Sequence, residues 1–146
     1  AFLYLNFILN MTNKEENYTF TKAERVTGAK RVDAIFASGR SFISYPLRVV
    51  FAQHEQSPTP ICSILVTVPK KRIKKAVHRN RIKRLIREAY RLNKRLVNDI
   101  ELNKQSLDIA FVYIKDESSN YKEIDKAMKK ALKQVAIRIK KTEPSE

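Results

Sequence analysis

The sequence predicts an α+β fold, a two-layer α/β sandwich with the element order αβββαβα. Two observations predict it: extended apolar runs that read as strands, and segments with apolar residues at helical spacing placed before, between and after them. The chain has 146 residues, of which 43% are hydrophobic. This length allows one folded core and is too short for two domains.

Residues 28–38 are expected to form the first helix, because four apolar residues recur there at helical spacing. They are Ala29, Val32, Ile35 and Phe36. Gly39 follows, at the position where the end of a helix favours a left-handed residue. We therefore expect the helix to end at this glycine.

Three strands are expected next, in the runs RSFIS, PLRVVFAQ and ICSILVTV. The segment HEQSPTP contains two prolines and predicts a loop between the second and third strands. We expect the three strands to form an antiparallel meander. Because side chains alternate along a strand, Leu47, Val49 and Phe51 share one face, while Arg48, Ser63 and Thr67 make the opposite face the wetter one.

A basic helix follows and is expected to run to about Leu96. A strand at LDIAFVYI and a last helix from about Asn120 to Lys140 close the fold. The apolar stripe of the last helix should face the sheet. It consists of Ile124, Met128, Ala131, Leu132, Val135 and Ile139.

The basic helix carries most of the charge of the chain. Between Lys70 and Arg95 there are thirteen Lys and Arg residues and the single acid Glu88, whereas the whole chain has a net charge of +15. One side of the helix is apolar and comprises Ile82, Leu85, Ile86, Ala89, Leu92 and Leu96. The other side is polar and comprises Asn80, Lys83, Arg84, Arg87, Arg91, Lys94 and Arg95.

Neighbouring like charges on a helix repel one another, so this face predicts a polyanionic partner. A merely solvated face usually mixes Glu with Lys, and a membrane-surface helix needs exposed apolar bulk. Nucleic acid is favoured over both, because arginine suits bidentate phosphate binding.

No catalytic or metal site is expected in the chain. His54 and His78 have no ligand-type residues at suitable spacing, and the only cysteine, Cys62, lies in an apolar run. We recognise no acid pair, nucleophile–base pair or phosphate-binding glycine loop that would form a catalytic constellation. No membrane or small-molecule substrate is expected.

The ends of the chain are expected to lie outside the domain. Residues 1–17 are an N-terminal extension that we expect to be disordered, and residues 142–146 a disordered tail. Residues 1–10, AFLYLNFILN, are either a non-native extension before a start at Met11 or a packed N-terminal strand. They resemble neither a membrane span nor a secretory signal, so a cytoplasmic location is expected.

The stretch VPKKRIKKAVHRNRIKRLIREAYR resembles the signature region of the protein subunit of bacterial ribonuclease P. The family pattern of KK, AV and RNRIKRLIRE is met by Lys70, Lys71, Ala76, Val77 and residues 79–88. The resemblance extends over residues 18–141, taken as a single RNA-binding domain. It implies a left-handed βαβ crossover and a catalytic RNA that holds the active site and Mg²⁺. It also implies two partners, ribonuclease P RNA and precursor tRNA.

The resemblance implies two RNA contacts. Residues expected to face the catalytic RNA are Lys70, Lys71, Lys75, Arg79, Asn80, Arg81, Lys83, Arg84 and Arg87. Residues expected to line a cleft for the 5′ leader of precursor tRNA are Val32, Phe36, Tyr45, Arg48, Val50 and Thr67. Family members commonly have aromatic residues at the positions of Val32 and near Val50, so only Phe36 remains to stack on bases. Its spacing also fits a buried core residue.

Two other functions remain open from the residues. A structural ribosomal or other RNA-binding protein would show the same basic α/β architecture. An autonomous nuclease would need a catalytic constellation that the sequence lacks.

Overall fold

The computed structural model describes residues 24–26, 28–55, 62–98 and 105–142. The interpretations of residues 1–10 and 1–17, and most of the tail, lie outside the described residues. The elements are α2 (Ala29–Ser38), β1 (Arg40–Ser44), β2 (Leu47–Glu55), β3 (Cys62–Thr67), α3 (Ala76–Asn93), α4 (Arg95–Asn98), β4 (Gln105–Tyr113) and α5 (Tyr121–Thr142). The predicted order αβββαβα is confirmed, with the short helix α4 added after α3.

The four strands form one mixed sheet in the order β1-β2-β4-β3. Strand β4 is antiparallel to β2 and parallel to β3, with Cys62 opposite Leu107. The predicted meander is therefore wrong for its third strand, because β4 lies between β2 and β3. Residues 106–111 of β4 are all buried, as suits a central strand. Helix α3 supplies the crossover that parallel neighbours require. Strand β3, helix α3 and strand β4 thus form a βαβ unit. The family resemblance implies that the crossover of this unit is left-handed.

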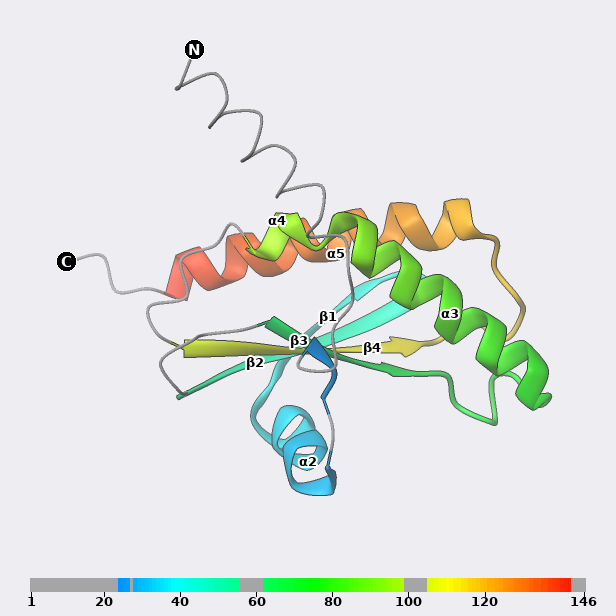
Figure 1. Cartoon of the computed structure of the whole chain (residues 1–146), viewed down its shortest axis with the longest axis horizontal. Helices are drawn as coiled ribbons and strands as arrows, with labels where there is room; N and C mark the ends of the chain where they lie inside the picture. The colour runs from blue at the N-terminus through cyan, green and yellow to red at the C-terminus, as the bar shows by residue number, and fades with distance from the viewer. Residues whose placement is uncertain (1–23, 27, 56–61, 99–104, 143–146) are drawn as a thin grey trace, which may run out of the picture.

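Helices lie on both faces of the sheet (Figure 1). Helices α3, α4 and α5 lie on one face, and α2 lies on the other. The main core fills the first side and includes Phe51, Ile64, Phe111 and Tyr90, together with the predicted stripe of α5. A smaller core beneath α2 consists of Val26, Ile35, Val50 and Ala110. Helix α2 is thus supported by the sheet.

Two predicted positions near the end of the basic helix are wrong. Leu92 is 37% exposed, whereas Tyr90 is fully buried in its place. Lys94 was expected on the polar face but is only 6% exposed, and its Nζ lies 3.1 Å from both carboxylate oxygens of Glu24. Helical spacing accounts for both positions. Lys94 still has helical backbone (φ −61°, ψ −21°) and follows the buried Tyr90 by four residues, so it lies at the edge of the buried stripe, whereas Leu92 lies outside that stripe.

Gly39 ends α2 for a different reason from the predicted one. Its φ of −75° is ordinary extended backbone, whereas the left-handed glycine is Gly28, before α2, with φ 91°. A Cβ atom on Gly39 would lie 2.2 Å from the Ile35 carbonyl oxygen and 2.7 Å from Val50 Cγ1. Close packing of the chain against α2 and β2 therefore requires glycine here.

Replacing Gly39 with alanine should lower the free energy of unfolding by about 1–3 kcal/mol, because the Ile35 carbonyl is backbone and cannot rotate away. Denaturant unfolding measures this change. Ser38→Ala is the control, since Ser38 is exposed and its hydroxyl only donates to the Ala34 carbonyl, so its effect should stay within about 0.5 kcal/mol. Equal stability of Gly39→Ala and wild type would contradict the close approach.

Cys62 lies in the main core and should be chemically inert. It is 5% exposed, and Tyr90 Oη donates to its sulfur across 3.3 Å. Burial raises the pKa of the thiol to about 12, although the hydrogen bond from Tyr90 opposes the shift. Because the thiolate is the reactive form, a disulfide reagent at about pH 8, near the ordinary thiol pKa, should not modify the native protein. The same reagent should modify the chain fully in denaturant, and rapid native modification would contradict this burial.

Candidate RNA interface

The predicted catalytic-RNA residues gather on the approach to α3 and along its outer face. Seven of the nine are exposed, and they are Lys70, Lys71, Lys75, Asn80, Arg81, Arg84 and Arg87. Arg79 and Lys83 are half-buried. Among the described residues, no acid forms an ion pair with Arg81, Arg84 or Arg87. The electrostatic repulsion among these three arginines is therefore not balanced by an acid within the described residues, and binding of a polyanion would reduce it.

Arg79 has a structural task as well as a charge. Its Nη1 donates to the carbonyl oxygens of Ile73, at 3.0 Å, and Lys74, at 2.6 Å. Ile73 is buried, so these bonds hold the basic segment before α3 against the body of the protein. Arg79 thereby fixes Lys70, Lys71 and Lys75 relative to the helix.

The first turn of α3 adds to the positive potential. Lys75 precedes the helix and makes no side-chain capping hydrogen bond, and no acidic residue stands in the first turn. The positive end of the helix dipole is thus left next to Lys75. This arrangement weakens the isolated helix and favours an anion there.

A groove of about 440 Å³ lies beside this face, lined by Arg25, Asn80, Arg84, Arg87, Glu88 and Arg91. Arg91 was predicted on the polar face, but it binds Glu88, and this hydrogen bond lowers the pKa of the Glu88 carboxyl. Its charge is locally balanced. Arg25 joins the groove from the segment before α2, a contribution that no pattern in the sequence indicated.

The sheet face beneath α2 is arranged in rows set by the strand register. Val50, Ala110 and Leu65 form one row across β2, β4 and β3, and α2 packs over it. The next row runs Ile43, Arg48, Val112 and Thr67, and none of its members belongs to that small core. Arg48 and Ile43 are exposed, and Thr67 and Val112 are half-buried. An open row that carries the polar side chains of Arg48 and Thr67 therefore lies next to α2.

The predicted leader residues divide into accessible and buried ones. Phe36 is 47% exposed and Tyr45 is 62% exposed, so the core interpretation of Phe36 does not hold. Ile35, at 1% exposure, occupies the core position instead, and Val32 is half-buried beside it. Val50, at 3%, has no surface for a ligand and supports α2 from below. Ser63, expected on the wetter face, is also fully buried.

An ion pair fixes α2 on the sheet. Arg31 of α2 donates through Nε and Nη2 to the two carboxylate oxygens of Asp108 on β4, at 3.1 Å and 2.7 Å. The Asp108 side chain is 3% exposed, and its hydrogen bond raises the pKa of the Arg31 guanidinium. Sequence reasoning missed the pair. The available signal was an aspartate inside the otherwise apolar strand LDIAFVYI.

Replacing Arg31 with methionine should lower the free energy of unfolding by about 1–3 kcal/mol, because it leaves the buried Asp108 carboxylate without its bidentate partner. Denaturant unfolding measures the loss. The double variant Arg31→Met/Asp108→Asn should recover part of it, since no buried charge then remains unpaired. Strictly additive effects of the two substitutions would show that the pair does not couple α2 to the sheet.

The described residues offer no metal site and no membrane span. They contain no cluster of three or more His, Cys, Asp or Glu side chains placed to hold an ion. Helices long and apolar enough to cross a bilayer are likewise missing from the described part of the chain.

Comparisons with known proteins agree on one family. The ribonuclease P family model matches residues 20–136. A ribonuclease P protein component from Porphyromonas gingivalis is 41% identical over 120 residues, covering 82% of this chain and 88% of that protein. One from Chlorobaculum tepidum is 32% identical over 111 residues, covering 70% and 72%.

Solved structures show the same fold. The ribonuclease P protein of Staphylococcus aureus superposes with a TM-score of 0.61 at 24% identity, covering 78% of this chain and 96% of that one. The Thermotoga maritima protein superposes with the same score and identity, covering 76% and 96%.

Proposed function

The chain belongs to the bacterial ribonuclease P protein family, and we propose that its two faces bind two different RNAs. Proteins of this family are subunits of the endoribonuclease that matures the 5′ end of tRNA. The α3 face binds the catalytic RNA. The open row beside α2 binds the 5′ leader of precursor tRNA. The observation that carries the proposal is the separation of these surfaces by the sheet (Figure 1).

The α3 face suits a folded RNA backbone. Arg81, Arg84 and Arg87 lie at i, i+3 and i+6, so they form one slanting row of exposed basic residues on the outer side of α3. Each can bind a phosphate through two parallel hydrogen bonds. Lys70, Lys71 and Lys75, held by the Arg79 bonds, extend the charge around the start of the helix.

The face beside α2 suits a single strand. Arg48 supplies a charge for one phosphate, Thr67 a hydroxyl, and Phe36 an exposed ring on which a base can stack. Val32 borders the row, and Val50 lies underneath as support. Tyr45 stands where the row meets the edge strand β1.

The chemistry of cleavage is assigned to the RNA. Enzymes of this family depend on Mg²⁺, but the described residues supply no site that fits the ion. We therefore place Mg²⁺ on the catalytic RNA and substrate and derive no step through it from this chain. The protein contributes by binding and by orienting the precursor. A cytoplasmic location, where tRNA precursors are processed, belongs to the same proposal.

Reconstitution tests the proposal. The purified full chain is added to a protein-free ribonuclease P RNA and precursor tRNA at moderate Mg²⁺. Stimulation of cleavage that requires both RNA and protein supports it. Cleavage by the protein alone would place the active site in this chain, and RNA binding without stimulation would leave only a structural RNA-binding role.

A further inference from the structure

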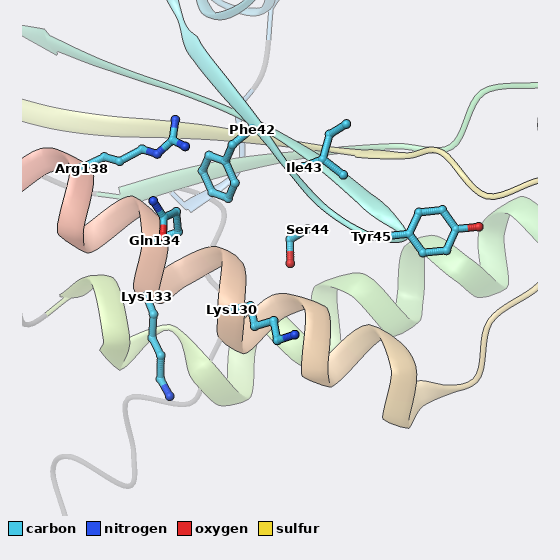
Figure 2. Close-up of a pocket in the computed structure, with 8 residues that line it drawn as sticks. All are labelled: Phe42, Ile43, Ser44, Tyr45, Lys130, Lys133, Gln134 and Arg138. Carbon is cyan, nitrogen blue, oxygen red and sulfur yellow. The ribbon is translucent and has the colours of Figure 1, made fainter.

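A second basic groove lies on the edge of the sheet, between β1 and α5 (Figure 2). Its volume is about 550 Å³. Ile43 and Tyr45 border it from the β1 side, and Lys130, Lys133, Gln134 and Arg138 border it from α5. None of the residues assigned above to the catalytic-RNA face lines it.

Three of the four α5 residues that line the groove are basic. Residues 126–142 contain seven Lys and Arg residues and no acid. Lys130 and Lys133 are exposed, and among the described residues neither forms an ion pair. The Cζ atom of Arg138 lies over the Phe42 ring, 4.7 Å from its centre, and this contact holds the positive charge beside the groove. The wall therefore favours phosphate groups.

The groove is held in shape by the fold. Ser44, at the end of β1, is buried and donates through Oγ to the Ala127 carbonyl of α5 at 2.8 Å. Figure 2 shows Phe42 and Ser44 directed toward α5 and Ile43 directed to the opposite side of the strand. Strand β1 is thereby fixed against α5, and a groove with fixed walls lowers the ordering cost of binding.

Its border favours a single strand over a duplex. Tyr45 is 62% exposed and Ile43 is 68% exposed, and both are available for contact with an unpaired base. An exposed aromatic ring beside lysines is the usual combination for single-stranded nucleic acid, because the ring stacks on bases while the lysines follow the backbone.

The groove continues the surface proposed for the leader. In the register of the sheet, Ile43 lies directly opposite Arg48, so the open row of Arg48, Val112 and Thr67 reaches the β1 edge at Ile43. Tyr45 belongs to both surfaces. We infer that the distal part of a longer leader, upstream of the nucleotides beside α2, rounds the β1 edge and binds in the β1–α5 groove. This inference rests on the proposed leader function.

The test compares holoenzymes on precursors with a short leader of a few nucleotides and with a leader several-fold longer. Lys130→Ala/Lys133→Ala should weaken binding of the long-leader precursor about tenfold at low salt. The slope of the logarithm of its affinity against the logarithm of salt concentration should fall by about 1.4, which is about 0.7 for each lost phosphate contact of a single strand. Affinity for the short-leader precursor should stay within about twofold, because its leader does not reach the groove. Lys122→Ala/Lys126→Ala is the matched control, since it removes the same charge from exposed positions of α5 that do not line the groove.

Each other outcome overturns the inference. Equal weakening for both leader lengths would mean that the groove binds the tRNA body or the catalytic RNA. Unchanged affinities would leave the groove for another occupant, such as an acidic peptide. If the control weakens binding as much, the effect is net charge alone. Failure of the underlying leader function looks different, because wild-type holoenzyme would then bind precursor and mature tRNA equally at every leader length.

Discussion

Replacing Arg81, Arg84 and Arg87 with alanine should weaken binding to the catalytic RNA by about 3–6 kcal/mol, since a hydrogen bond to a charged group is worth about 1.5–3 kcal/mol and the three losses are not fully additive. The affinity should then depend less on salt. The slope of its logarithm against that of salt concentration should fall by about 2–3, at 0.7–0.9 per lost phosphate contact. Titration of labelled RNA at several salt concentrations measures both quantities.

The triple variant should fold normally. All three side chains are exposed, and no acid pairs with them among the described residues, so their removal relieves repulsion within α3 and leaves the core intact. The matched variant carries lysine at the same three positions. It should keep most of the salt slope but lose part of the affinity, because lysine cannot bind phosphate in the bidentate way. An unchanged slope in a folded alanine variant would remove this face from the interface.

Arg79 should behave differently from its neighbours. Its guanidinium binds the carbonyl oxygens of Ile73 and Lys74, so Arg79→Ala should lower both the melting temperature and the RNA affinity. In the sequence, Arg79 is one more arginine of the basic stretch. Only the folded turn shows that it also holds the lysines before α3 in place.

The sequence predicted elements better than their arrangement. Helical and strand spacing are local signals, and they located α2, α5 and all four strands. The strand pattern alone predicted a meander and missed the pairing of β3 with β4, because this pairing depends on where the crossover through α3 returns the chain, which no local pattern encodes. Only the family resemblance, through the βαβ crossover that it implies, indicated parallel strands on either side of α3. Gly39 was recognised as special, but its reason, contact with the Ile35 carbonyl and Val50, exists only in the tertiary structure.

The two candidate surfaces were predictable to different degrees. The α3 face can be predicted from the sequence alone, because positively charged residues recur on consecutive turns of the helix. Lys94 is an exception, because its ammonium group is buried in an ion pair with Glu24, which is distant in the sequence. The face beside α2 gives a weaker signal, since a single phenylalanine and a single arginine are also compatible with a core residue and a solvated one. The strand register, which places Arg48, Val112 and Thr67 in one row, was needed to define it.

Replacing Phe36 and Arg48 with alanine should weaken holoenzyme binding to precursor tRNA by about 2–4 kcal/mol, from one lost stack of about 1–3 kcal/mol and one lost charge-assisted contact. Binding to mature tRNA, which has no leader, should be nearly unchanged. Equilibrium binding of the two tRNAs to the reconstituted holoenzyme measures the difference. The affinity of the protein for the catalytic RNA should also stay near wild type, because α3 lies on the opposite face of the sheet.

Stacking and burial can be separated at Phe36. Phe36 is 47% exposed, so removing its ring should cost little stability, in contrast to its neighbour Ile35, which is 1% exposed. Phe36→Leu keeps apolar bulk on α2 but removes the ring. If the ring stacks on a leader base, the leucine variant should lose precursor affinity almost as the alanine variant does. If Phe36 only supports α2, leucine should restore the affinity. A loss shared equally by precursor and mature tRNA would mean that the leader does not bind beside α2, because only an interaction with the leader can distinguish the two.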